Sequence, residues 1–297
     1  MSGQLKEVRE RIKSVKSTQQ ITKAMKMVSA SKLRKAQQGI VQLRPYADRL
    51  NKMLVNILSN LEGDADTVFK KERGEDKIAI VVVTSNKGLC GAFNSNVIKA
   101  AVAKIKNDYW TQYEAGNVTI IPIGRKGFEF FQKNYKKATI IDDHVFLVND
   151  LTYENVEQAA LVAMDGFREG QFDKVFAAYG RFKNAAMQFP EMVQFLPVKK
   201  LELKGKAVKR KADYIFEPSK HDLLQELVPS ILKTTFKKFV LDTHASEHGA
   251  RMTAMDSATE NAQEMLNELK INYNKARQEA ITKELSEIVG GAAALGG

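Results

Sequence analysis

One short segment has the residue types and the position of a phosphate-binding turn. It runs from Ser85 to Asn94, with the sequence Ser-Asn-Lys-Gly-Leu-Cys-Gly-Ala-Phe-Asn, directly after an apolar run that reads as a buried strand. Backbone amides in a turn between a strand and a helix can bind phosphate. The glycine spacing, however, matches neither Gly-x-x-x-x-Gly-Lys-Ser/Thr nor Gly-x-Gly-x-x-Gly. A structural turn with tight backbone packing is therefore the preferred interpretation, and no cofactor site is predicted.

Three other sets of residues have reactive side chains but lack the neighbours that chemistry needs. His244 and His248 lie four residues apart, which could place two metal ligands on one helix face, but no metal-binding motif surrounds them. Cys90 is the only cysteine, so neither an intrachain disulfide nor a cysteine-based zinc site can form. The pair Asp142-Asp143 reads as part of a loop. The sequence therefore predicts no catalytic residue and no metal site.

Positive charge is concentrated in the first sixty residues. The chain has a net charge of +11, and residues 1–60 contain thirteen Lys and Arg residues against three acidic residues. A solvated helix face would explain this segment. So would a helix that meets an acidic partner, such as nucleic acid, phospholipid or acidic protein loops. Tyr46 is the only aromatic residue there, so the segment lacks the interleaved aromatic residues typical of nucleic-acid binding.

Two long helices are predicted, over residues 1–61 and 217–297. The first carries the basic segment and the second carries His244 and His248. Apolar residues at steps of three and four form a heptad seam in both, and two such helices can pair antiparallel as a coiled coil. Pro45 predicts a kink or a break, and Gly290-Gly291 predicts fraying. The seam positions are Leu5, Val8, Ile12, Val15, Leu33, Ala36, Ile40, Leu43, Ala47, Leu50, Leu54, Ile57 and Leu61, and Ala245, His248, Met252, Met255, Thr259, Ala262, Leu266, Leu269, Tyr273, Ala276 and Ala280.

The seam is irregular at two places. Between the two N-terminal runs the expected positions are polar, and the apolar residues stand one step away. Near the C-terminus the apolar phase shifts by one residue. Each irregularity is either an adaptive stutter or a functional feature. In a paired coil, both are expected near the same tip. The polar positions are Gln19, Thr22, Lys26 and Ser29, and the displaced residues are Ile21, Met25, Val28, Ile281, Leu285, Ile288 and Ala292.

The middle of the chain, residues 77–216, alternates strands with helices. This order is typical of an α/β layer with a mostly parallel sheet. The fold class is therefore α+β or α/β: a long antiparallel coiled coil of the N- and C-terminal helices plus a central Rossmann-like α/β domain. Residues 199–211 read as an exposed basic loop. Strands are predicted at 77–84, 118–123, 139–146, 173–182 and 192–203, and helices at 94–109, after Gly127, and at 151–169.

Four motifs, in order along the whole chain, resemble the gamma subunit of F-type, proton-translocating ATP synthases. Residues 274–292 (NKARQEAITKELSEIVGGA) look like the C-terminal signature of that family, and residues 18–33 (TQQITKAMKMVSASKL) are similar to its N-terminal hallmark. The turn at 85–94 and residues 213–218 (DYIFEP) match as well. The resemblance implies a central rotor shaft without a catalytic site of its own, which couples rotation of the membrane c ring to conformational change in the beta subunits.

The resemblance also implies partners and contact residues. The coil is expected inside a head of alternating alpha and beta subunits, with the α/β domain beside the epsilon subunit and the polar loops of the c ring. Charge-assisted hydrogen bonds from Arg277 are the strongest expected contacts. The residues expected to contact alpha and beta are Met25, Lys26, Arg277, Gln278, Thr282, Glu284 and Glu287, and those expected to contact the c ring are Asp213, Tyr214 and Glu217.

Two other functions are compatible with the residues themselves. A coiled-coil adaptor could bind nucleic acid or acidic protein through the basic helix, and would do so in a salt-sensitive way. An α/β enzyme with helical arms would bind nucleotide as an isolated chain. The rotor reading requires neither, and expects no nucleic-acid partner. The N-terminus has no apolar secretory region. It is basic and contains serine, as transit peptides do, but its apolar spacing continues into the following residues, so we expect it to belong to the mature fold. We therefore expect a bacterial protein that is peripheral on the cytoplasmic face of the plasma (inner) membrane.

Overall fold

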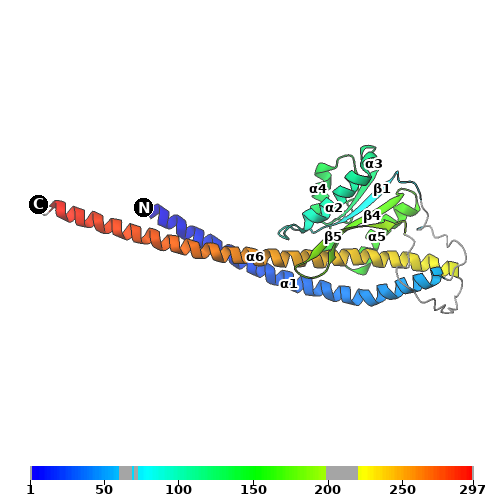
Figure 1. Cartoon of the computed structure of the whole chain (residues 1–297), viewed down its shortest axis with the longest axis horizontal. Helices are drawn as coiled ribbons and strands as arrows, with labels where there is room; N and C mark the ends of the chain where they lie inside the picture. The colour runs from blue at the N-terminus through cyan, green and yellow to red at the C-terminus, as the bar shows by residue number, and fades with distance from the viewer. Residues whose placement is uncertain (1, 60–68, 70–72, 199–219, 296–297) are drawn as a thin grey trace. The chain divides into compact units, whose positions relative to one another are not determined.

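A computed structural model describes residues 2–59, 69, 73–198 and 220–295 (Figure 1). The chain divides into two compact units, one of residues 1–29 with 252–297 and the other of residues 30–251. Two helices, α1 (Ser2–Ser59) and α6 (Lys220–Leu295), continue from one unit into the other. The second unit also holds the whole central sheet.

Five strands form the sheet, in the order β3-β2-β1-β4-β5. All pairs are parallel except that of β4 with β5, which is antiparallel. The predicted mostly parallel α/β layer is thus confirmed. The strands are β1 (Ile78–Val83), β2 (Val118–Ile123), β3 (Thr139–Ile140), β4 (Lys174–Phe182) and β5 (Gln188–Leu196), and the helices between them are α2 (Phe93–Asp108), α3 (Trp110–Glu114), α4 (Arg125–Asn134), the 3-10 turn η2 (Leu147–Asn149) and α5 (Tyr153–Arg168).

The alternation of side chains along β1 divides the core into two layers. Ala79, Val81 and Val83 pack with α5 and with Val228 to Val240 of α6. Ile78, Ile80 and Val82 face the opposite way and pack with α2 and Phe131 of α4. Because both faces of a central parallel strand are covered, β1 is apolar at every position. Helix α6 is therefore an integral part of the core of this unit as well as a long helix.

Three local predictions differ from the structure. The third strand stops at Ile140, because residues 142–147 form successive turns, with the Val145 amide donating to the Asp142 carbonyl. The fifth strand begins at Gln188, where the hairpin closes onto Phe182, and ends at Leu196. Helix α3, a single short helix of five residues, had no periodic signal in the sequence.

The long helices are not interrupted at the proline and glycine residues where a break or fraying was predicted. Helix α1 runs through Pro45 without a break, and α6 runs through Pro229 and continues past Gly290 and Gly291 to Leu295. A proline within a helix removes one backbone hydrogen bond, and the contacts along the rest of a long helix can compensate for it. The proposed domain limits at 61 and 217 and the basic loop at 199–211 lie outside the described residues, so these remain predictions.

Candidate partner-contact surface

Within the unit of residues 1–29 and 252–297, α1 and α6 pair antiparallel. Side-chain contacts link residues whose numbers rise on α1 as they fall on α6, which is the mark of antiparallel pairing. The predicted coiled coil is confirmed here. The linked pairs are Arg9 Nη2 to Tyr273 Oη at 3.0 Å, Gln19 Nε2 to Gln263 Oε1 at 2.9 Å, Thr22 Oγ1 to Thr259 Oγ1 at 2.8 Å, and the ion pair of Lys26 with Asp256.

At the first irregularity of the heptad pattern, in α1, the seam positions keep their places in the heptad but hold polar residues. Thr22 and Ser29 are buried in the positions that the heptad assigns to the seam. Ile21 and Val28 instead point outward and are 60% and 57% exposed. A stutter would have turned the apolar residues inward. The helix here keeps its polar residues inside and presents apolar residues to its surroundings.

The second irregularity does not lie beside the first, so the expectation of a shared tip is wrong. The polar stretch of α1 pairs with Asp256, Thr259 and Gln263. Arg9 already pairs with Tyr273. By the same antiparallel count, residues of α6 after about 280 lie past the start of α1. The phase shift at 281–292 therefore falls on a part of α6 that no described residue of α1 covers.

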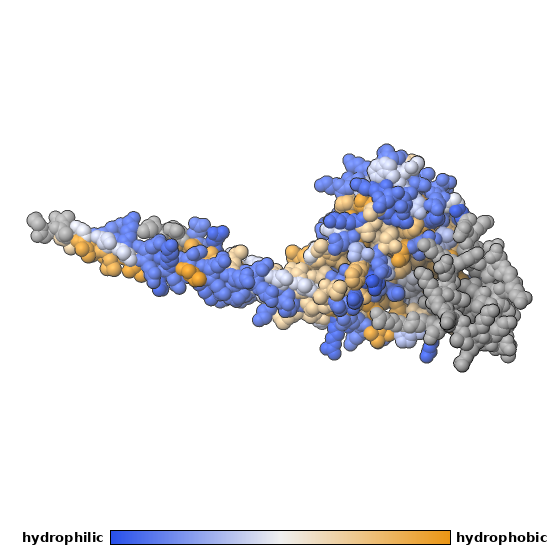
Figure 2. Space-filling view, viewed as in Figure 1, coloured by the Kyte–Doolittle hydropathy of each residue, from blue (hydrophilic) through white to orange (hydrophobic). Residues whose placement is uncertain are grey.

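An exposed apolar stripe results on this terminal part of α6. With about 3.6 residues per turn, Ile281, Leu285 and Ile288 lie on one face. Their side chains are exposed, as is that of Val289, and Ile288 is 67% exposed. Apolar (orange) residues are visible among hydrophilic ones on the paired helices toward the C-terminus (Figure 2). Clustered exposed apolar residues mark a surface that a partner covers.

Four of the five contact residues predicted on α6 lie within or beside this stripe. All five are exposed. Arg277 and Glu284 lie along one edge of the stripe, Gln278 lies within it, and Thr282 lies along the other edge. Glu287 lies nearly opposite the stripe and forms an ion pair with Lys283 at 3.8 Å. The five residues therefore do not form one polar cluster, and four of them adjoin one apolar surface.

Two of the other predicted contact residues, Met25 and Lys26, lie on α1 within the described part of the chain. Met25 is half-buried, and its carbonyl accepts a hydrogen bond from Ser29 Oγ at 2.8 Å. Lys26 is half-buried and held by Asp256, so its ammonium group is only partly free for a partner. Asp213, Tyr214 and Glu217 lie outside the described residues.

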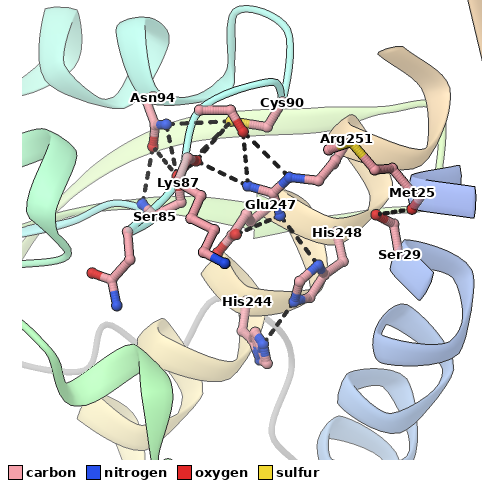
Figure 3. A network of polar contacts seen from close by, with 12 residues as sticks. Met25, Ser29, Ser85, Lys87, Cys90, Asn94, His244, Glu247, His248 and Arg251 are labelled. Atoms are coloured by element: carbon pink, nitrogen blue, oxygen red, sulfur yellow. Dashed lines mark hydrogen bonds and ion pairs between the residues drawn. The ribbon is translucent and has the colours of Figure 1, made fainter. Parts of the chain in front are cut away.

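The candidate phosphate turn has the wrong polarity for a phosphate. The carbonyl oxygens of Lys87 and Gly88 face α6 and accept hydrogen bonds from the Arg251 guanidinium, at 2.9 and 3.2 Å from Nη2 (Figure 3). Asn94 closes the turn from inside, since its Oδ1 accepts from the Ser85 amide at 2.9 Å. A turn that directs carbonyls outward to a cation binds no anion there. The interpretation as a structural turn is supported.

The histidine pair belongs to the same buried network. Nε2 of His244 lies 2.9 Å from Nε2 of His248. Burial, with Lys32 and Arg251 nearby, lowers the pKa of His244 to about 4. Burial, with His244, Arg251 and Lys32, lowers the pKa of His248 to about 3. Among the described residues no group of three or more His, Cys, Asp or Glu side chains could hold a metal ion. The positive charges of Lys32 and Arg251 nearby would also repel a metal ion.

Sequence reasoning did not find the centre of this network. Arg251 and Glu247 are buried, and Nη1 of Arg251 donates to Oε1 of Glu247 at 2.6 Å. The spacing of four residues between an acid and a base was a visible signal, but it is common on solvated helix faces. Only the packing of the turn against α6 distinguishes this pair from a surface pair.

Comparison with known proteins identifies the family. The ATP synthase family matches residues 4–295. The chain is 52% identical over 294 residues to the ATP synthase gamma chain of Cytophaga hutchinsonii, which covers 98% of each chain, and 49% identical to that of Flavobacterium johnsoniae, which covers 99% of each. The chain belongs to the ATP synthase gamma-chain family. The gamma chain of Chlorobium luteolum is 45% identical and covers 98% of both chains.

The fold of the chain also resembles solved structures. A chain in the Euglena gracilis mitochondrial ATP synthase, from the assembly of OSCP, F1 and c-ring, has a TM-score of 0.69 at 24% identity and covers 99% of this chain and 95% of its own. A chain in the rotor of the same enzyme has a TM-score of 0.60 at 22% identity, with 95% and 100% covered. At these identities the likeness concerns the fold.

Family membership confirms the main functional prediction. Gamma chains are non-catalytic subunits that form the rotor shaft of the ATP synthase complex, and the comparisons do not support a basic adaptor for nucleic acid or acidic protein. The gamma chains of Cytophaga, Flavobacterium and Chlorobium are bacterial, which fits the expectation from the sequence. In the described part of the chain, no helix has the length and apolar character needed to cross a membrane.

Proposed function

We propose that this chain transmits rotation to the catalytic alpha and beta subunits through the exposed apolar stripe of α6 and the polar residues beside it. The observation that carries the proposal is the exposure of Ile281, Leu285 and Ile288 on a stretch of helix that has no described partner on α1. An apolar stripe of this kind is stabilised when a partner removes it from water. A smooth apolar contact is also non-directional, which suits a surface that slides during rotation.

Arg277 and Gln278 supply the directional part of this contact. Arg277 is exposed and lies beside the apolar stripe, where its guanidinium can make paired hydrogen bonds to a carboxylate of a catalytic subunit. Gln278 and Thr282 supply neutral hydrogen bonds on the other side, and Glu284 and Glu287 favour basic groups on the partner. We assign these contacts to particular rotational positions of the shaft, because hydrogen bonds require specific geometry.

A second contact with alpha and beta lies at the polar stretch of α1. The exposed Ile21 and Val28 flank Met25 and Lys26 there, so apolar and cationic groups are offered together. The basic residues of the first helix attract acidic loops of the catalytic subunits. Attraction between solvent-exposed charges steers association without fixing one position.

We further propose that the remaining contacts lie at the membrane end of the complex. Asp213, Tyr214 and Glu217 contact the polar loops of the c ring, and the α/β domain contacts the epsilon subunit. The chain then lies on the cytoplasmic face of the bacterial inner membrane and is held there only through the complex. The c-ring contact rests on the family motif at residues 213–218, and the other assignments rest on the family resemblance of the whole chain.

ATP hydrolysis by the alpha and beta subunits, with and without this chain, tests the proposal. We expect a strong gain in rate with the chain, and loss of that gain on truncation after Tyr273. Arg277→Ala with Gln278→Ala is expected to lower the gain. Glu279→Ala is the matched control, because its exposed side chain lies on a different face of the same helical turn. A full gain with the truncated chain would exclude the C-terminal surface as the site of action.

A further inference from the structure

The turn between β1 and α2 forms a receptor for a cation on α6. Asn94 Nδ2 donates to Ser85 Oγ at 2.7 Å and to Cys90 Sγ at 3.2 Å, and its Oδ1 accepts from the Ser85 amide. Leu89 and Gly91 both have positive φ, at 61° and 57°. This backbone conformation directs the carbonyls of Lys87 and Gly88 toward α6 (Figure 3). The receptor is built from backbone oxygens that its own side chains hold in place.

The Arg251 guanidinium donates three hydrogen bonds to this receptor and one to Glu247. Nη2 donates to Lys87 O at 2.9 Å and to Gly88 O at 3.2 Å, and Nε donates to Gly88 O at 3.3 Å. Nη1 donates to Glu247 Oε1 at 2.6 Å. The residue is only 7% exposed. A planar guanidinium satisfies these divergent acceptors together, whereas a lysine ammonium is a single point of charge that cannot span them.

Two further contacts hold α6 just before Arg251. The Gly180 amide at the end of β4 donates to Thr243 Oγ1 at 3.1 Å, and Ser246 Oγ donates to Gly180 O at 3.0 Å. The next turn of the helix passes close to the β4–β5 hairpin, since a Cβ on Gly249 would lie 3.2 Å from Ala185 O. Successive turns of α6 are thus held by hydrogen bonds, which resist rotation of the helix because they are directional.

Arg251 is the last residue of its compact unit along α6, and Met252 begins the other unit. The helix itself continues unbroken to Leu295. Any torque carried by α6 must therefore pass this position. Glu247 completes the arrangement from one helical turn earlier. Its Oε2 is buried without a partner among the described residues, so the carboxylate is committed to Arg251 through Oε1 alone.

We propose that Arg251 is a positioning residue that fastens α6 to the β1–α2 turn, with Glu247 holding its guanidinium, and that this fastening transmits torque between α6 and the α/β part of its unit. The proposal rests on the rotor function and assigns a role to the turn at 85–94. The residues act through the placement of α6, and they touch no nucleotide. His248 adds one neutral contact, since its Nδ1 lies 3.3 Å from Arg251 Nη1, and Lys32 of α1 adds positive charge nearby.

A variant that removes the fastening while keeping the fold separates this role from simple stability. Removing Arg251 alone would leave Glu247 buried and unpaired, so the pair is replaced together as Glu247→Met with Arg251→Met. Apolar replacement of a whole buried ion pair commonly preserves stability. Arg168→Met is the matched control, because it removes an exposed ion pair with Asp165 in the same unit. Arg251→Lys, which keeps the charge, is a second test.

The sole cysteine reports on the turn directly. Cys90 is buried, and burial raises the pKa of its thiol, so labelling by a maleimide requires the turn to open. In the paired Met variant and in Arg251→Lys we expect labelling to be about tenfold faster or more than in the parent chain. The thermal midpoint of the paired Met variant should change little. Arg168→Met is expected to label like the parent chain. Unchanged labelling in the paired variant would overturn the proposed fastening.

Torque is tested in the membrane-bound holoenzyme by comparing ATP-driven ion pumping with ATP hydrolysis. We expect the paired Met variant to retain hydrolysis and to pump fewer ions per ATP, and Arg251→Lys to fall between it and the parent. Equal pumping per ATP in the parent and the paired variant would overturn the role in torque, even if labelling is faster. Failure of the unaltered chain to support hydrolysis would instead contradict the proposed rotor function.

Discussion

The hydroxyl groups of Thr22 on α1 and Thr259 on α6 meet at 2.8 Å in the seam of the coil. Each also contacts a carbonyl of its own helix, Thr22 that of Gln19 at 3.0 Å and Thr259 that of Met255 at 2.7 Å. Two hydroxyl hydrogens are therefore shared among three close oxygen contacts, and one contact always lacks a hydrogen. This seam position is specific, but it contributes less to stability than an apolar pair would.

Replacing both threonines should stabilise the coil. Thr22→Val with Thr259→Val exchanges two hydrogen-bonded hydroxyls for methyl groups of similar shape, and because both partners are replaced together no polar group loses its partner, so we expect a gain of up to about 1 kcal/mol. Thermal unfolding of the full chain measures this as a rise in midpoint. Ile12→Val, which removes one methylene from the seam without adding or removing a polar group, is the comparison. A clear fall in midpoint for the double variant would contradict the account of the seam.

Polar replacement on the exposed stripe should weaken partner binding without unfolding the chain. In Leu285→Gln with Ile288→Gln, both side chains are already solvent-exposed, so the thermal midpoint should change little. Affinity for a head of alpha and beta subunits should fall about tenfold or more, because apolar area is no longer buried there. Surface-immobilised binding kinetics measures the change, with Glu279→Ala as the reference. Undiminished affinity would show that the stripe is not the contact.

Two glycines that follow β1 and β2 should differ in their tolerance of alanine. Gly124 has φ of 101°, and a Cβ there would lie 2.1 Å from the Thr84 carbonyl oxygen. Gly124→Ala should therefore cost about 3 kcal/mol or more, or prevent folding. Gly88→Ala meets no atom within 4 Å and should be close to neutral. Urea denaturation of the full chain compares the two, and similar losses in both would refute the steric argument.

Acid should destabilise the unit that holds the histidine pair. The folded chain keeps His244 and His248 neutral down to pKa values of about 4 and 3, whereas the unfolded chain protonates them near pH 6.5. The unfolded state therefore binds more protons in this window, and stability falls as the pH drops below about 6.5, by up to about 1.4 kcal/mol per pH unit for each histidine. Burial raises the pKa of Glu247, which acts in the opposite direction and offsets part of this loss.

The histidine contribution is measured by urea denaturation at pH 7, 6 and 5. We expect His244→Gln with His248→Gln to flatten the dependence on pH relative to the parent chain. His144→Gln is the control, because His144 lies in a loop outside the cluster and is half-exposed. A double variant with the same slope as the parent would show that these two groups do not govern acid stability.

Periodic apolar residues made the architecture predictable. Residues such as Leu33, Ala36 and Ile40 lie in the seam as the heptad spacing indicates, and the uniformly apolar run of β1 marks a central parallel strand. The ends of strands were less predictable, because β3 and β5 end where turns and pairing partners determine them. Such long-range constraints leave little trace in a local pattern.

The polar features could be located in the sequence but not interpreted. Thr22 and Ser29 were visible as breaks in the apolar pattern, yet the sequence alone did not decide between a stutter and a functional feature. Arg251 escaped notice because its acceptors are backbone carbonyls, which carry no side-chain signature. Contact residues such as Arg277 came from family resemblance, and their partners remain to be tested.

The polar pairs along the coil also fix the register of α1 against α6. If α1 slid by one heptad against α6, Thr22 would face Leu266 or Met252 in place of Thr259, and Gln19 would face Lys270 or Asp256 in place of Gln263. An apolar seam would tolerate such a slip far better. A slip of seven residues would move the C-terminal tip by about 10 Å. Hydrogen bonds far from the tip therefore determine how far α6 projects beyond α1.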